Sequence, residues 1–113
     1  MDVGGGINYT KAFLSKATGY TALAGDRVVM DNTTAAATLV LPLAPLDGQW
    51  VDVSGAVLYS LFPVYVEGTS RSIMVAADKN CELDGNNTAY RFWWVEAESL
   101  WKIRIIEQLG VVS

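Results

Sequence analysis

Histidine is absent from this sequence, cysteine occurs once, and charged residues make up only 18% of the 113 positions. The absence of histidine excludes every catalytic triad, general base and zinc site that depends on an imidazole. A single cysteine, Cys81, can form neither an internal disulfide nor a cysteine cluster. We therefore interpret Cys81 as a small buried or half-buried residue with no second cysteine to pair with.

Positive charge is also scarce, which limits the kinds of partner that the chain can bind. Eight Lys and Arg stand against twelve Asp and Glu, for a net charge of −4, the wrong sign for a protein that binds a phosphate backbone. The longest apolar run, Ala56–Val66, is interrupted by Ser60 and Pro63 and is shorter than the roughly 20 residues of a membrane-spanning helix. The first six residues contain an acid and three glycines, unlike a signal peptide. We expect no nucleic-acid partner, no membrane partner, and synthesis in a cytoplasm.

The sequence is apolar for a soluble monomer. Hydrophobic residues make up 51% of the chain and the mean hydropathy is +0.25. The length of 113 residues predicts a single domain. Apolar surface that one domain of this size cannot bury is commonly shared between chains. We therefore expect a homodimer or a homotrimer.

The chain divides into a small polar lead-in and a strand-rich body. Residues 1–18 are expected to form an N-terminal arm, and residues 19–113 a β-sandwich domain. Within the arm, Tyr9, Phe13 and Lys16 are spaced as on one face of a helix. The spacing leaves both a short helix and an extended arm open.

Turn-forming pairs such as Asp47-Gly48 and Glu67-Gly68 recur at short intervals in the body and separate short β-favouring runs. The expected strands are Tyr20–Leu23, Arg27–Met30, Ala36–Leu41, Trp50–Val53, Ala56–Leu61, Val64–Glu67, Ser72–Ala76, Tyr90–Val95 and Trp101–Ile106. This pattern predicts an all-β fold, specifically an antiparallel, jelly-roll-like β-sandwich.

The last two runs predict a hairpin. In Tyr90–Val95 both faces are rich in aromatic or aliphatic residues, so we expect one face on the core and the other, with Trp93, against a second sheet or a partner. In the final run, Trp101, Ile103 and Ile105 are expected on the core face. Lys102 and Arg104 alternate with them and should point outward.

Partner contacts are expected at four residues. Ile7, Tyr9 and Phe13 are the apolar residues of the arm that could anchor it on a neighbouring subunit, and Trp93 is the candidate on the domain itself. A few buried apolar or aromatic residues usually supply most of the energy of a protein contact.

Residues that could support chemistry have simpler interpretations. The stretch Asn80–Gly85 resembles the start of a calcium-binding loop, but Arg91 stands where the loop needs a bidentate glutamate. The carboxylate pairs that a glycosidase would need are Asp26 with Asp31, Asp47 with Asp52, and Glu96 with Glu98. Most of these residues fit turns or a solvated hairpin end. We expect no enzyme, and no catalytic, cofactor-binding or metal-binding residue.

The four tryptophans allow two interpretations. Their rings could stack on sugars, as in a carbohydrate-binding domain, or pack in the core and in a subunit interface. We favour the second interpretation, because a small β domain without disulfides needs large aromatic residues to fill its core.

Three stretches resemble a small β module of tailed-bacteriophage virion proteins. They are Tyr20–Asp31, with the pattern Y-x-x-x-x-G-D-x-V-x-x-D; Thr38–Pro42, with T-x-x-L-P; and Pro45–Val53, with P-x-x-G-x-x-V-x-V. A late W-x-I, Trp101 to Ile103, resembles the last strand of that module. The likeness extends from Tyr20 to Ile105.

The resemblance implies a non-enzymatic virion protein with no catalytic or metal residues to carry over. Short chains with this module resemble capsid decoration, cement or staple proteins, which bridge subunits of the major capsid protein on the capsid exterior. Longer proteins with such modules resemble tail fibres, which implies an alternative: a tail component that binds a host surface polysaccharide. A bacterial carbohydrate-binding module is a third possibility outside virions.

Overall fold

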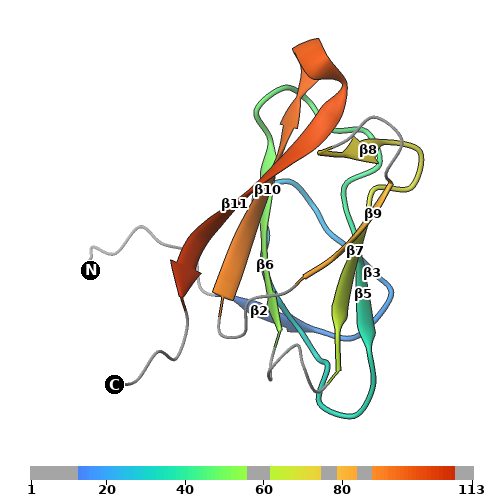
Figure 1. The fold of residues 1–113 in the computed structure, drawn as a ribbon, viewed down its shortest axis with the longest axis vertical. Helices are drawn as coiled ribbons and strands as arrows, with labels where there is room; N and C mark the ends of the chain where they lie inside the picture. Colours follow the sequence, from blue (N-terminus) through green and yellow to red (C-terminus); the bar gives the residue numbers. More distant parts are fainter. Residues whose placement is uncertain (1–12, 56–61, 75–78, 84–87, 109–113) are drawn as a thin grey trace.

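The computed structural model describes residues 13–55, 62–74, 79–83 and 88–108, which form two sheets (Figure 1). The strands are β2 (Leu14–Lys16), β3 (Tyr20–Thr21), β4 (Arg27–Met30), β5 (Ala37–Val40), β6 (Trp50–Gly55), β7 (Val64–Glu67), β8 (Ser72–Ile73), β9 (Asn80–Glu82), β10 (Thr88–Val95) and β11 (Leu100–Gln108). One 3-10 helix, η1 (Glu96–Glu98), joins the last two strands. The all-β prediction is confirmed.

Consecutive strands alternate between the two sheets from β2 to β9. The six-stranded sheet has the order β2-β4-β6-β10-β11-β8, and the four-stranded sheet has the order β3-β5-β7-β9. A chain that crosses to the facing sheet and back returns in its original direction. The neighbours β2 and β4, β4 and β6, β3 and β5, and β5 and β7 are therefore parallel.

The antiparallel expectation is wrong for these pairings, and also for β8, which runs parallel to β11. Antiparallel pairing is found between β10 and β11, β10 and β6, and β7 and β9. The turn pair Asp47-Gly48 does lie between strands and Glu67-Gly68 at the end of one, but a turn residue indicates only that the chain changes direction. It does not indicate whether the next strand enters the same sheet or the facing one.

One apolar cluster holds the two sheets together, and both sheets contribute to it (Figure 1). On β6, Val51 and Val53 point into the cluster, as the two-residue period of a strand requires. The fully buried members with the largest side chains are Trp101, Phe92, Met30, Leu39, Leu41, Val28, Val51, Val53, Val64 and Val66. Cys81 is half-buried and packs against the cluster; the predicted degree of burial is confirmed.

The predicted hairpin is present as β10 and β11. Phe92 and Trp94 face the core, and Trp94 meets Trp101 edge-to-face, with the ring centroids 5.7 Å apart. The turn closes through η1 and Ser99, which has a left-handed backbone with φ of 54°. On β10, and at Trp101 of β11, the core positions of the hairpin are thus those that the alternation predicts.

The prediction for Ile105 is wrong. Its side chain is 59% exposed, whereas Trp101 is fully buried and Ile103 is partly buried against the core. A register shift between Ala89 and Tyr90 lies next to the Tyr90–Ile105 pair. Because β11 continues past the end of the core, the alternation no longer guarantees burial there.

The predicted arm falls partly outside the described residues. Ile7 and Tyr9 lie there, and so does the expected strand Ala56–Leu61. Leu14–Lys16 is strand β2, which pairs with β4 at one edge of the six-stranded sheet. Of the two conformations left open for these three residues, the structure has the extended one.

The stretch Tyr20–Asp31 forms a hydrogen-bonded turn between the sheets. The Tyr20 hydroxyl and the Leu23 N–H both donate to Asp26 Oδ2, at 2.5 Å and 2.9 Å. Gly25 has a φ of 86°, which a residue without Cβ adopts at no steric cost, and its N–H donates to the Trp50 carbonyl at 2.7 Å. The polar and glycine positions of this motif thus hold the chain as it crosses from β3 to β4.

We expect Trp101→Ala to lower the free energy of unfolding by about 3–5 kcal/mol, because the buried ring leaves a cavity. The indole N–H of Trp101 has no hydrogen-bond partner among the described residues, so the side chain contributes to stability through apolar packing. Lys102 points outward on the same strand and pairs with Glu98 at 3.0 Å, and Lys102→Ala should cost less than about 0.5 kcal/mol. Chemical denaturation measures both values, and equal losses would show that the register of β11 is wrong by one residue.

We expect Tyr20→Phe to change how stability depends on alkaline pH. The hydrogen bond to Asp26, with smaller contributions from desolvation and the Asp26 charge, raises the pKa of Tyr20 to about 12. The unfolded pKa is about 10, so the stabilisation is fully present below that pH and is lost as the pH rises through the folded pKa. Tyr20→Phe should lower stability at neutral pH and flatten the alkaline decline, as denaturant titrations would show. Tyr65→Phe, at an exposed position of β7, is the control; a decline unchanged in Tyr20→Phe would contradict the hydrogen-bond assignment.

Candidate partner-binding face

A row of charged residues crosses the outer face of the six-stranded sheet. The register aligns Arg27 of β4 with Asp52 of β6, Asp52 with Arg91 of β10, and Arg91 with Arg104 of β11. These four residues, here called the arginine row, alternate with core residues along their strands. The two-residue period that buries Val51 therefore places Asp52 on the opposite face.

Asp52 is the centre of the row. Although it lies on the outer face, its side chain is fully buried. It accepts hydrogen bonds from Arg27 Nε at 3.0 Å, and from Arg91 Nε at 2.7 Å and Nη2 at 3.1 Å. The hydrogen bond to Asp52 raises the pKa of Arg91 above its ordinary value, because the carboxylate favours the charged guanidinium. One carboxylate thus ties three adjacent strands together.

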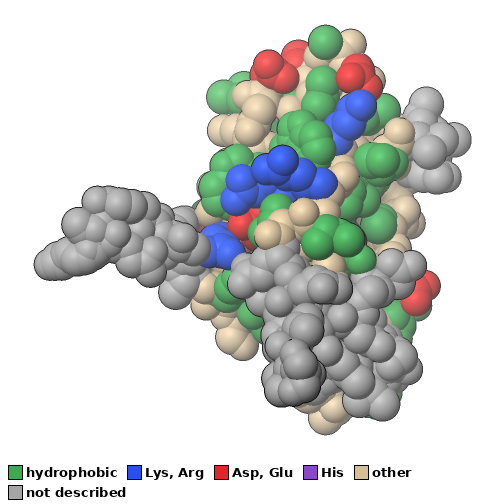
Figure 2. Space-filling model, turned by 60° about the vertical axis from the view of Figure 1, so that its left-hand side comes forward, with side chains coloured by type: hydrophobic (Ala, Val, Ile, Leu, Met, Phe, Trp, Pro, Cys, Tyr) green, Lys and Arg blue, Asp and Glu red, His purple; other side chains and the backbone are tan. Residues whose placement is uncertain are grey.

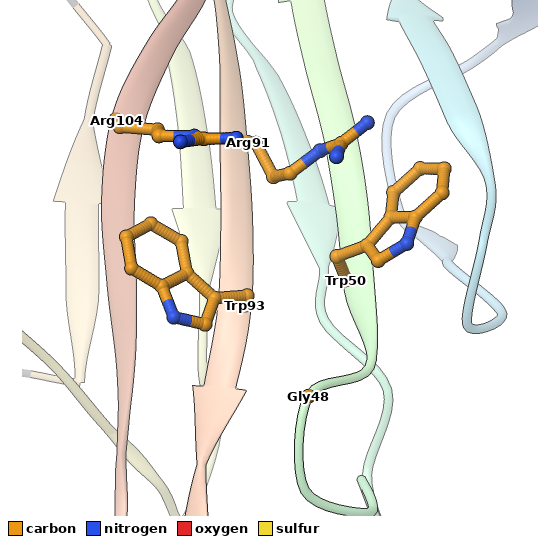
Figure 3. Close-up of a pocket in the computed structure, with 5 residues that line it drawn as sticks. All are labelled: Gly48, Trp50, Arg91, Trp93 and Arg104. Carbon is orange, nitrogen blue, oxygen red and sulfur yellow. The ribbon is translucent and has the colours of Figure 1, made fainter. Parts of the chain in front are cut away.

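Each arginine of the row also lies over an aromatic ring. The guanidinium carbon is 4.3 Å from the centroid of Phe13 for Arg27, 3.9 Å from Trp50 for Arg91, and 5.9 Å from Trp93 for Arg104. Arg91 leans across the sheet toward β6, and Arg104 leans in the same direction toward β10 (Figure 3). Stacking of this kind is favourable for a planar cation and fixes its orientation.

The tryptophans and arginines at the centre of this face line a shallow pocket of about 330 Å³. We call it the arginine–tryptophan pocket; it is formed by Gly48, Trp50, Arg91, Trp93 and Arg104 (Figure 3). Figure 2 shows basic side chains forming a band between hydrophobic ones on this side of the molecule. The lining of the pocket thus combines two cations with two aromatic rings.

A smaller pocket of about 190 Å³ lies on the four-stranded sheet, where Thr38, Tyr65, Glu67 and Asn80 line it. Its charged residue is acidic, and none of its lining residues is a cation. The two sheets therefore present pockets of different charge.

The structure places Trp93 in the arginine–tryptophan pocket and Phe13 at the other end of the arginine row. The two predicted residues Ile7 and Tyr9 lie outside the described part of the chain. Sequence reasoning did not single out Trp50, Arg91 or Arg104 as binding residues. The available signal was alternation: Arg91 and Trp93 share the outward face of one strand, but only cross-strand register brings Arg104 and Trp50 beside them.

The carboxylates considered for acid–base chemistry are each held by a structural contact. Asp26 accepts from Tyr20, and Asp52 from two arginines. The other contacts are Asp31 with the Thr33 N–H and hydroxyl, Asp47 with the Glu96 N–H, Glu96 with the Trp94 indole N–H, and Glu98 with Lys102. Within the described ranges, no group of three His, Cys, Asp or Glu residues comes together as a metal site would require. The stretch Asn80–Gly85 lies partly outside those ranges.

Comparison with known proteins gives a likeness of fold alone. No family model and no curated protein matches the sequence. A solved structure described as the structure of a chaperone-substrate complex is similar, with a TM-score of 0.50 and 14% sequence identity. The likeness covers 80% of this chain but only 14% of the other. In the part of the chain that the structure describes, no helix is long and apolar enough to cross a membrane.

We expect Asp52→Asn to lower the free energy of unfolding by about 2–3 kcal/mol, because two arginines lose their shared anion. The expected value lies below that of a fully buried pair, since 29% of the Arg91 side chain is exposed and can be hydrated. Asp47→Asn, at an exposed position that accepts from the Glu96 N–H, is the control and should cost less than about 1 kcal/mol. Urea titrations measure both; an equal effect would show that the buried ion cluster does not stabilise the sheet.

Proposed function

We propose that this chain is a non-enzymatic structural protein of a tailed-bacteriophage virion. In this role it binds the capsid exterior as a decoration or cement protein and bridges subunits of the major capsid protein. The observation that carries the proposal is the arginine–tryptophan pocket on the outer face of the six-stranded sheet. Trp and Arg are enriched in protein interfaces and often dominate their energetics.

The sequence resemblance supports the virion assignment. Its motif positions Tyr20, Gly25 and Asp26 make the hydrogen bonds that carry the chain between the sheets, so the motif is a signature of fold rather than of catalysis. We also propose the finer description of the fold as a jelly-roll-like sandwich. Two sheets around one core support that description, while the parallel pairings depart from a wholly antiparallel pattern.

Rigid support is a second feature that suits a cement protein. The pocket residues lie on β6, β10 and β11 or next to them, and Asp52 fixes Arg91 from below. A pre-organised surface loses little conformational entropy on binding. We extend the proposal to a homodimer or homotrimer, supported by the apolar composition and by exposed apolar side chains such as Leu23, Leu46 and Ile105.

The alternative is a tail or tail-fibre component that binds a host surface polysaccharide. The half-buried rings of Trp50 and Trp93 in an open pocket favour it, because aromatic rings can stack on sugars. Against it, each ring already has a guanidinium over it. We therefore keep the capsid proposal first.

Quantitative mass spectrometry of purified virions, from the phage that encodes this chain, tests the proposal. A decoration protein should be present at a fixed ratio, comparable in copy number with the major capsid protein. A copy number far below that of the capsid protein would favour the tail alternative. Absence from purified virions would overturn both.

A further inference from the structure

The arginine row carries more positive than negative charge. The row contains three arginines and one aspartate, in a chain whose net charge is −4. Asp52 is bonded to Arg27 and Arg91, whereas no described carboxylate lies within 4.0 Å of the Arg104 guanidinium. Like charges directly opposite each other on neighbouring strands are unfavourable. The Arg91–Arg104 pair is therefore a position where a bound anion would relieve repulsion.

The donors of this pair are oriented before any ligand arrives. Asp52 accepts from Nε and Nη2 of Arg91, and the guanidinium carbon lies over the Trp50 ring, 3.9 Å from its centroid. Arg104 is exposed and lies over Trp93, and its side chain reaches across the sheet toward Arg91 (Figure 3). A planar guanidinium can bind a carboxylate through two parallel hydrogen bonds.

The surroundings favour an acidic protein segment over other anions. A nucleic acid needs an extended basic surface, but the positive surplus here is local to one row. An acidic polysaccharide would be expected to stack on open rings, whereas a guanidinium lies over each tryptophan. A pocket of about 330 Å³ has room for one or two acidic side chains.

We propose that the arginine–tryptophan pocket binds glutamate or aspartate side chains of an acidic segment in the protein to which this chain attaches. The proposal deepens the proposed function, on which it rests for the identity of that partner as a capsid protein. Arg104 supplies the principal contact, Arg91 the second cation, and the two tryptophans the apolar walls.

A titration of the purified full-length protein with an end-blocked peptide of alternating glutamate and glycine tests the proposal. Two-dimensional NMR of the tryptophan indole N–H groups reports the site, because Trp50 and Trp93 line the pocket while Trp94 and Trp101 are buried in the core. We expect saturable shifts that are largest for the pocket pair. The affinity should fall as salt is raised, since the contact is between charges near the surface.

Three variants make the titration specific. Arg104→Gln should weaken binding at least tenfold, and Arg104→Lys should weaken it less, because lysine keeps the charge but loses the planar pair of donors. Lys79→Gln removes one positive charge outside the pocket, from an exposed position before β9, and should change binding less than twofold. Thermal melting of each variant checks that the substitution, which is at an exposed position, leaves the fold intact.

Several results would overturn the proposal. One is a peptide with glutamine in place of glutamate that binds equally well; another is equal weakening by Arg104→Gln and Lys79→Gln. Tighter binding of polyglucuronate or of single-stranded DNA would instead assign the pocket to a polysaccharide or a nucleic acid.

The peptide titration and the virion measurement test different proposals, so a negative result in one does not decide the other. Peptide binding by a protein that is absent from virions would overturn the proposed function and leave the pocket assignment standing. Presence in virions without peptide binding would overturn the pocket assignment alone.

Discussion

The buried Asp52 carboxylate is the contact on which the outer face of the six-stranded sheet depends. It accepts hydrogen bonds from arginines of β4 and β10. These strands flank β6, with β4 parallel to it and β10 antiparallel, so the carboxylate links all three. A buried carboxylate without such partners would be strongly unfavourable. Replacing Asp52 and both arginines together by apolar residues of similar volume could leave stability unchanged, but this face would then present no oriented guanidinium. The ion cluster therefore fixes geometry more than it adds stability.

The alternation of strands between two sheets explains how that face is built. Every second strand from β2 to β6 belongs to the six-stranded sheet, so β2, β4 and β6 run parallel to one another. This arrangement brings Phe13, Arg27 and Asp52 into one line across the sheet. The hairpin of β10 and β11 then adds to β6 in the antiparallel sense and continues the line with two more arginines. Residues far apart in sequence thus become neighbours through register alone.

The residues that resemble the phage module and the residues that line the pocket overlap only at Gly48 and Trp50. Tyr20, Gly25 and Asp26 stabilise a crossing between sheets, while Arg91, Trp93 and Arg104 lie on the hairpin outside the quoted motifs. A scaffold whose signature is structural can present different surfaces without changing its fold. This separation is why a likeness of fold says little about what such a domain binds.

The sequence by itself determined most of the described strands and much of the core, because these follow from local features. Two-residue alternation places Phe92 and Trp94 inward, and turn residues mark where Arg27–Met30 and Val64–Glu67 begin and end. Asn80–Glu82, which is strand β9, was not predicted. Tertiary structure decided which sheet each strand entered, and hence the parallel pairings. It also decided that Ile105 lies beyond the core and that Arg104 meets Arg91 above Trp93. Alternation describes one strand at a time. Register and the limits of the core are properties of several strands packed together.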